Sequence, residues 1–415
     1  MNPKKQIRSI FVLCLVILTL EVNAMSAEAV FYVATNGNDS WSGTLSSPND
    51  GKTDGPFATL IKARDASRLA KGAKVYVREG NHFLNEPLIL TSEDSGMTIS
   101  AYENEKPVIS GGRQIKGWKK VEVDGKKLWM IEIPEVKEGK WLFHELWVNG
   151  GRRVMARHPN KGYLKVADVI EKTEQWVQGQ SSFQFNEGDM KAWKTANDAE
   201  VVVMCRWVES HLPIKSVDES QRVVYFPYKS VFQLATGDQY YVENALELLD
   251  APGEWYLNKK EGKLYYMPMS DEDMSIAEVI APVLTQLVRL EGKPEAGQII
   301  QNVTFKGLAF SHTEWWLPEG SGGFGQAAVG VPGMIYGEGV NNCTWESCTI
   351  AHAGNYAIEL SRGCKGNKII YCEISDLGAG GVKLGETSIR DNEAERTSGN
   401  EVRDCQIHDG GIIFH

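Results

Sequence analysis

Four polar residues recur at one position of a repeated pattern in the C-terminal third of the sequence. Segments that begin NVTFKG, NCTWES, NKIIYC and NEVRDC align without gaps at their starts, and each carries a His or an Asp two positions after an apolar residue. These residues are His312, His352, Asp376 and Asp409. If the segments stack as neighbouring parallel strands, they form a column with about 5 Å between neighbours. Two carboxyl groups about 5 Å apart match a retaining glycosidase, and a wider gap matches an inverting one.

This column is predicted to be catalytic. We expect Asp376 and Asp409 to be the acid/base pair, assisted by His352 and Glu359, because like charges at this spacing raise one pKa as a general acid requires. The competing interpretation is that these residues close bends, where Asp and His side chains bond backbone groups. An Asp376→Asn variant that loses turnover but not stability favours catalysis, and a matching loss of stability favours a bend.

The predicted substrate-binding residues lie near this column. They are Trp315, Trp316, His312, Asn355 and Lys383. The adjacent tryptophans head a Gly-rich loop, where they either stack on sugar rings or clasp the protein surface. Glu359 and Lys383 occupy equal positions in adjacent repeats, as a structural ion pair or as a base beside a cation. Asn355 either bonds a ligand or closes a turn.

The sequence predicts no metal ion and no other cofactor. The acidic loop 386–399 leaves Ca²⁺ open as an alternative, since calcium takes several oxygen ligands, but a solvated charged face has the same composition. The spacing of Cys343 and Cys348 does not match a zinc site. The six cysteines beyond the N-terminal leader are interpreted as small buried residues, with a disulfide as the alternative.

The repeat spacing indicates the elements that position these residues. Cys348, Cys372 and Cys405 fall at one position of the repeat, 24 and 33 residues apart. A coil of 24 residues fits a parallel β-helix, in which apolar residues point inward as ladders. The extra residues of the longer coil fall in the polar stretch ETSIRDNEAERTSG, which is expected to leave the surface as a loop.

The rest of the chain divides into segments that differ in their patterns of apolar and polar residues. Residues 1–24 have the charged, apolar and small-residue regions of a signal peptide. Residues 28–112 contain short strands at about ten-residue spacing and an amphipathic helix, expected to begin at Pro56 and to cap the first coil. Residues 113–290 alternate strand-like runs with long polar loops, which indicates an inserted antiparallel domain. Residues 291–415 contain the repeats described above and are expected to form coils of the parallel β-helix.

Composition limits the partners. Forty-four basic residues against 54 acidic ones give a net charge of −10, which disfavours nucleic acid. Beyond the leader no apolar run reaches 18 residues, so no membrane span is expected in the mature chain. We therefore expect a secreted or periplasmic monomer that binds polysaccharide or oligosaccharide.

Several segments resemble right-handed β-helix proteins related to glycoside hydrolase family 141. The segments are ENALELLDAPGEWYLNKKEGKLYYMP, GLAFSHTEWWLP, IAHAGNYAIELSRGCKGN and DLGAGGVKLGE. The resemblance covers nearly all of the mature chain. It implies an all-β fold, a right-handed parallel β-helix with an inserted antiparallel β-domain and an N-terminal capping helix. It also implies activity on plant cell-wall glycans, either fucosides or xylan.

One departure from the relatives bears on the site. They continue for several coils after the IHDGG segment, where most of their catalytic carboxylates are expected, whereas this chain stops at His415. We expect a truncated product whose residues form one wall of a cleft. The leading prediction is a glycoside hydrolase acting on a plant or algal polysaccharide. The alternatives are a polysaccharide lyase with Lys383 as base beside Ca²⁺, and a non-catalytic carbohydrate-binding or surface protein.

Overall fold

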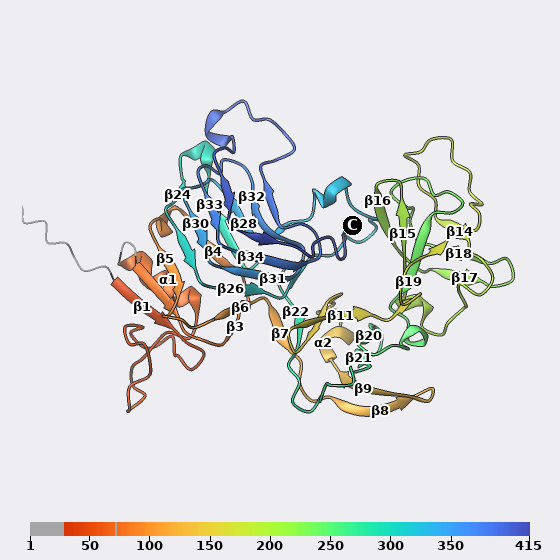
Figure 1. Ribbon diagram of the computed structural model, residues 1–415, viewed down its shortest axis with the longest axis horizontal. Coiled ribbons are helices and arrows are strands. Elements are labelled where there is room, and N and C mark those ends of the chain that lie inside the picture. Colours follow the sequence, from red (N-terminus) through yellow and green to blue (C-terminus); the bar gives the residue numbers. More distant parts are fainter. Residues whose placement is uncertain (1–28, 71–72) are drawn as a thin grey trace, which may run out of the picture.

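The computed structural model describes residues 29–70 and 73–415. The predicted signal peptide lies outside them. The described chain is nearly all β, with few helices (Figure 1). Strands from the two ends of the sequence, drawn in orange and blue, lie together, and the yellow and green middle of the chain lies beside them. The C-terminus lies between these two parts.

In the described chain, three large sheets and one two-stranded sheet contain only parallel pairs. Sheet A consists of β1 (Ala29–Val33), β2 (Ala73–Val77), β5 (Thr98–Ala101), β25 (Thr304–Lys306), β30 (Thr344–Glu346), β33 (Lys368–Ile370) and β36 (Glu401–Arg403). Sheet B consists of β3 (Asn81–Phe83), β6 (Val108–Ser110), β26 (Ala309–Ser311), β31 (Thr349–Gly354), β34 (Glu373–Leu377) and β37 (Gln406–Ile407), with β27 (Thr313–Glu314) beside β31. Sheet C consists of β4 (Leu88–Leu90), β23 (Val288–Glu291), β28 (Gly333–Glu338), β32 (Tyr356–Leu360) and β35 (Val382–Leu384). A two-stranded parallel sheet joins β24 (Ile300–Gln301) and β29 (Val340–Asn341).

From β30 to β35 the chain visits sheets A, B and C in turn, so each repeat adds one strand to each sheet, and β36 and β37 then extend sheets A and B. The register is the predicted one, with Ile350 beside Ile374 and Ile374 beside Ile407. Inward-facing side chains fill the space between the sheets, among them the stacked rings of Phe305 and Trp345. The six cysteines of the described chain are free thiols, and all but Cys405 are buried. They therefore serve as small core residues.

The middle of the chain forms mostly antiparallel sheets. Sheet D is mixed and runs β7 (Gly112–Gln114), β22 (Val279–Pro282), β10 (Leu146–Val148), β11 (Gly151–Met155), β20 (Glu254–Asn258), β21 (Lys263–Tyr266), β9 (Lys126–Glu132) and β8 (Lys119–Val123). Sheet E runs β12 (Arg157–His158), β19 (Gln239–Glu243), β15 (Glu200–Cys205) and β16 (Val208–Pro213), with β13 (Leu164–Lys165) beside β19. Sheet F runs β14 (Ser182–Gln184), β18 (Val223–Tyr225) and β17 (Ser216–Asp218).

The parallel sheets continue across the middle of the chain. Thr98 of β5 pairs directly with Thr304 of β25, and Val108 of β6 pairs with Ala309 of β26. Strands before and after the antiparallel segment are therefore hydrogen-bonded neighbours. The intervening residues leave the stack and return to the place where they left it.

Two α-helices are described, α1 (Leu60–Leu69) and α2 (Pro134–Lys137). Helix α1 packs on β1 and β2, but the prediction that Pro56 begins it is wrong. Thr59 is the N-cap, and its hydroxyl accepts a hydrogen bond from the Lys62 amide at 3.1 Å, while Phe57 still bridges to β1. Among the described residues, neither helix is long and apolar enough to cross a membrane.

Candidate active site

The predicted column lies at bends of sheet B. Its four members, His312, His352, Asp376 and Asp409, all have left-handed backbone conformations with φ between 51° and 66°. Asp and His enter this region more readily than most residues. The His312 and His352 rings stack with centroids 5.6 Å apart, and the backbone of each repeat bonds the next. The backbone therefore bends at these residues as the bend interpretation expects, but in the described chain their side chains bond other side chains and not backbone groups.

A hairpin from sheet D packs against this column. Strands β10 and β11 are joined by Asn149-Gly150, both with positive φ, as a tight hairpin turn requires. Cross-strand neighbours Trp147 and Arg152 reach the column from this hairpin. The Trp147 ring lies 5.2 Å from the His312 ring, and its indole N–H donates to Asp376 Oδ2 at 3.2 Å.

Arg152 joins the hairpin to sheet B. Its Nε donates to Asp376 Oδ1 at 2.6 Å, and its Nη2 donates to the carbonyl oxygens of Ala353 and Asp376 at 2.9 and 3.0 Å. Its Nη1 donates to the carboxylate of Glu145. His352 Nδ1 lies 2.6 Å from Asp376 Oδ2. The Asp376 carboxylate is thus held by Arg152, His352 and Trp147, yet its side chain remains 22% exposed.

The environment shifts the pKa values of the two carboxyl groups around Arg152 in opposite directions. Burial acts to raise the pKa of Asp376, but His352 and Arg152 outweigh it and lower that pKa well below its usual range. Burial raises the pKa of Glu145 to about 8, although Arg152 acts in the opposite direction. Asp376 is therefore held ionised, whereas burial favours the protonated form of Glu145 against the pull of Arg152. Such a split between neighbouring carboxyl groups is a signature of acid/base sites.

Asp409 does not act on Asp376 as expected. Its side chain is 73% exposed, and within the described chain its carboxylate has one hydrogen-bond partner, His408. The expectation that two stacked Asp residues raise one pKa is wrong for Asp376, because cationic and hydrogen-bond donors contact its carboxylate directly. Asp409 shares the backbone register of the column without sharing its carboxylate network.

A cavity of about 170 Å³ opens beside this network. Glu145 and Arg152 line it from the hairpin side, and His211, Glu243 and Trp316 line it from the other. Burial raises the pKa of Glu243 to about 8. Burial thus favours the protonated form of both carboxyl groups that line the cavity, Glu145 and Glu243.

The two predicted sugar platforms pack against protein. Trp316 stacks face to face on His144 with ring centroids 3.7 Å apart, and Trp315 packs edge-on against Phe414 at 5.3 Å. These contacts match the clasp interpretation. Trp316 still borders the cavity, so part of its surface stays available to a ligand.

Two other predicted substrate contacts are buried. Asn355 has no exposed surface, accepts a hydrogen bond from the Thr313 hydroxyl and donates one to the Thr285 carbonyl. His312 is 5% exposed and bonds the Ser110 hydroxyl, and burial lowers its pKa to about 3. Their surroundings leave no surface for a sugar, which argues against the predicted contacts and assigns both residues to packing.

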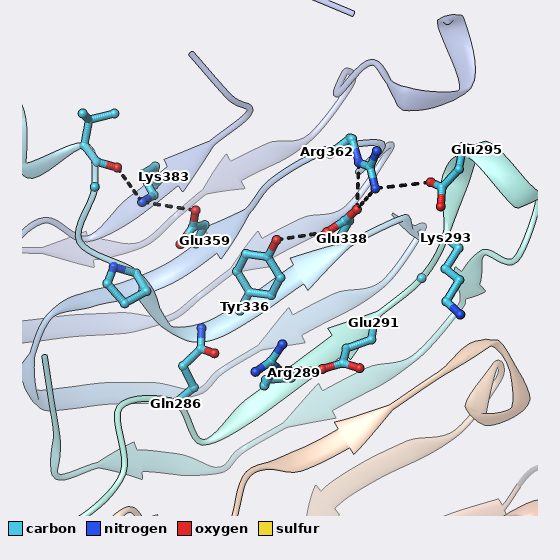
Figure 2. Close-up of a pocket in the computed structure, with 14 residues that line it drawn as sticks. Gln286, Arg289, Glu291, Lys293, Glu295, Tyr336, Glu338, Glu359, Arg362 and Lys383 are labelled. Carbon is cyan, nitrogen blue, oxygen red and sulfur yellow. Dashed lines mark hydrogen bonds and ion pairs between the residues drawn. The ribbon is translucent and has the colours of Figure 1, made fainter. Parts of the chain in front are cut away.

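Glu359 and Lys383 lie on a different face. They are register partners on β32 and β35 and form an ion pair of 3.2 Å (Figure 2). They border a charged groove of about 550 Å³ along sheet C, which Tyr336 and Arg362 also line. Glu359 is therefore separate from the Asp376 network. This placement does not support the prediction that Glu359 assists Asp376 in catalysis.

Two of the four acidic side chains of loop 386–399 pair with arginines. Glu386 pairs with Arg390 at 2.6 Å, and Glu395 pairs with Arg362 at 3.2 Å. Carboxylates engaged in this way are poor calcium ligands. This arrangement disfavours the Ca²⁺ alternative.

The sequence reasoning missed Trp147, Arg152 and Glu145. They lie outside the repeats, so no column points to them. The one signal was Asn149-Gly150 between apolar runs, which is a strong hairpin motif. That motif predicts the pairing of Trp147 with Arg152, but not the surface on which the hairpin packs.

Comparisons with known proteins bear on the fold and on one segment. A family model described as the GH141 insertion domain matches residues 225–269, which include β19, β20 and β21. A solved structure described as a glycoside hydrolase superposes with a TM-score of 0.77 at 23% identity, over 93% of this chain and 74% of that one. The described chain therefore shares its fold. A search of curated proteins found no match.

Two further solved structures are less similar. One, titled as a complex of XylC with xylose, has a TM-score of 0.40 at 15% identity, over 92% of this chain and 58% of that one. The other, a rhamnogalacturonan lyase, has a TM-score of 0.26 at 11% identity, over 91% and 67%. Scores this low do not indicate a shared overall fold.

Proposed function

We propose that this chain belongs to a carbohydrate-active enzyme, a glycoside hydrolase that cleaves a plant or algal polysaccharide. The insertion-domain match and the fold shared with a glycoside hydrolase support this reading. In the proposal, sheets A to C form a right-handed parallel β-helix, residues 28–112 its first coils with the capping helix and residues 291–415 its later coils. Residues 113–290 are an inserted domain. The protein is exported to the periplasm or medium as a monomer.

The carboxyl groups around Arg152 carry the proposal. Glycoside hydrolysis needs one protonated carboxyl group to protonate the leaving oxygen and one carboxylate to act as nucleophile or base. Glu145, whose pKa is raised to about 8, fits the first role and lines the cavity. Asp376, held ionised and part exposed, fits the second. Arg152 contacts both and fixes their relative position.

His352 and Trp147 hold Asp376 in place. Each contacts Oδ2, which leaves Oδ1 to Arg152, so the carboxylate cannot rotate freely. This restraint is what a positioned nucleophile or base requires. Asp409, exposed and one repeat further along, is the alternative acid in this proposal.

The geometry does not favour the lyase alternative. A lyase base needs a free lone pair, but Lys383 Nζ donates to the carbonyl oxygens of Val331 and Val329 and pairs with Glu359. All three ammonium protons therefore have acceptors. A non-catalytic binding role remains the rival that activity measurements must address.

The test is release of reducing ends from a panel of plant and algal polysaccharides. Asp376→Asn is expected to lower turnover by at least about a hundredfold, and Glu145→Gln by a similar factor. Asp409→Asn identifies the alternative acid if it, and not Glu145→Gln, abolishes turnover. Glu272→Gln is the matched control, because Glu272 is a buried carboxylate that pairs with Arg153, the residue after Arg152.

Each outcome has a definite reading. Wild-type hydrolysis lost in Asp376→Asn but retained in Glu272→Gln supports the proposal. Glycan binding without reducing-end release by the wild type would instead assign the chain a binding role. Equal activity of Asp376→Asn and the wild type would remove Asp376 from the mechanism.

A further inference from the structure

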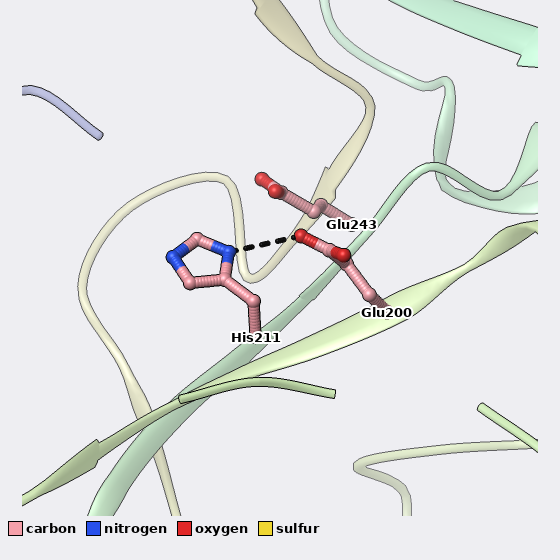
Figure 3. A group of neighbouring side chains, drawn as sticks. All are labelled: Glu200, His211 and Glu243. Carbon is pink, nitrogen blue, oxygen red and sulfur yellow. Dashed lines mark hydrogen bonds and ion pairs between the residues drawn. The ribbon is translucent and has the colours of Figure 1, made fainter. Parts of the chain in front are cut away.

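A second cluster of ionisable side chains lies on the far wall of the cavity, within sheet E. Glu200, His211 and Glu243 each offer one ligand atom, and these atoms all lie within 4.8 Å of one another (Figure 3). They come from three adjacent strands, β15, β16 and β19. His211 Nδ1 is 3.1 Å from Glu200 Oε1. The cluster uses none of the residues assigned to glycoside hydrolysis above.

The strand register places two acids opposite each other. Glu200 and Glu243 are direct cross-strand partners. Arg157, which also lines the cavity, stacks on Tyr241 with 3.8 Å between the guanidinium carbon and the ring centroid. In the described chain no ion pair joins Arg157 to Glu243, and the ion pairs of this cluster are those of His211 with Glu200 and Glu209.

His211 is oriented as a metal ligand usually is. Its Nε2 lies 3.3 Å from the carboxylate of Glu209, which leaves Nδ1 directed at Glu200. Glu209 has no exposed surface and is itself fixed by the amide and the ring Nδ1 of His415. A buried carboxylate that bonds one ring nitrogen of a histidine fixes the ring and makes the other nitrogen a stronger metal ligand, as is common around zinc.

We propose that Glu200, His211 and Glu243 bind one divalent transition-metal ion of the zinc or manganese class. One imidazole nitrogen with carboxylate oxygens suits these ions, whereas calcium prefers oxygen ligands alone. Binding requires the His211 nitrogen and both carboxyl groups to be deprotonated, so it should release protons. Because His211 and Glu243 line the cavity, the ion has an open side toward it. This inference is independent of the proposed glycoside hydrolysis, since it concerns metal binding and uses residues that have no role in that reaction.

The experiment is calorimetric titration of chelator-treated full-length protein with ZnCl₂, with MnCl₂ and CaCl₂ in parallel. We expect one Zn²⁺ per chain, weaker binding of Ca²⁺ and a metal-dependent rise in melting temperature. Glu243→Gln is expected to weaken Zn²⁺ binding at least tenfold while leaving the metal-free protein as stable as the wild type or more so. Glu209→Gln, which loosens the histidine, should weaken binding about 10–100-fold.

The controls keep the result interpretable. Glu272→Gln should bind Zn²⁺ as the wild type does, and circular dichroism shows whether each variant is folded. Absence of stoichiometric Zn²⁺ or Mn²⁺ binding to the wild type would overturn the proposal. So would undiminished binding by folded Glu243→Gln. Ca²⁺ binding as tight as Zn²⁺ binding would overturn the assignment of ion class.

Discussion

Arg152 and Asp376 are 224 residues apart in the sequence, and the guanidinium Nε of one lies 2.6 Å from the carboxylate Oδ1 of the other. The same guanidinium donates to two carbonyl oxygens of sheet B and to Glu145. One side chain from the antiparallel part thus ties the hairpin to two neighbouring strands of the parallel part. The arrangement of carboxyl groups exists only when both parts fold together.

Replacing Arg152 by Met should therefore cost both stability and activity. It leaves the half-buried Asp376 carboxylate without its main cation, and removal of one partner of a buried ion pair costs about 3–5 kcal/mol. We expect urea unfolding to show a loss of this size and reducing-end assays to show no turnover. Arg153→Met, which breaks the Glu272 pair instead, should lose stability but keep activity. A fully stable Arg152→Met protein would contradict the structural role assigned here.

For Asn355 we expect substitution to reduce stability without affecting substrate binding. Asn355→Ala removes a buried amide that joins the Thr313 hydroxyl to the Thr285 carbonyl, which should cost about 1–3 kcal/mol of unfolding free energy. Apparent KM for the polysaccharide should not change, because the residue has no exposed surface. Thr313→Val, which removes one of the two bonds, should cost less. A raised KM in folded Asn355→Ala would restore the predicted substrate contact.

The sequence predicted what the repeats encode and little of what packs on them. The alignment of Ile350, Ile374 and Ile407 and the Glu359–Lys383 pair followed from a fixed register, because parallel stacking turns equal positions into neighbours. Trp147 and Arg152 lie in a segment that occurs once. Their contacts with sheet B depend on how a hairpin docks, and no local pattern encodes this.

The same limit explains the error at the catalytic pair. The column placed Asp376 beside Asp409 correctly in backbone register, since the Leu377 amide donates to the Asp409 carbonyl. The pKa of a carboxyl group depends on every charge near it. Arg152, the cation nearest to Asp376, comes from outside the repeats, so its effect was not visible in the sequence.

Glu314 gives a prediction on pH. Burial raises the pKa of its carboxyl group to about 8, against an ordinary value of 4.5, although the backbone amides of His144 and Glu145 act to lower it. Between these two values the folded state holds a proton that the unfolded state has lost. The unfolding free energy therefore decreases as the pH rises from about 4.5 to 8, by at most about 1.4 kcal/mol per pH unit for one such group.

The Glu314→Gln variant removes this contribution. Urea unfolding at pH 5, 6, 7 and 8 should show a shallower loss of stability than in the wild type, with the largest difference at pH 8. A residual slope is expected, because burial also raises the pKa of Glu145 and Glu243. Glu319→Gln, in the exposed loop that follows β27, should keep the wild-type slope. An unchanged slope in Glu314→Gln would show that its carboxyl group is ionised in the folded protein.

Variants of the Glu359–Lys383 pair distinguish a structural role of this ion pair from a catalytic one. Both side chains are more than four-fifths buried, and Lys383 Nζ also bonds the Val331 and Val329 carbonyls, which hold the loop over β35. A double-mutant cycle with Glu359→Gln and Lys383→Met should give a coupling energy of about 1–2 kcal/mol in urea unfolding. Because the lysine has no free lone pair, Lys383→Met should keep hydrolytic turnover at temperatures where it stays folded. Unsaturated, ultraviolet-absorbing products from the wild type that disappear in Lys383→Met would instead make this lysine the base of a lyase.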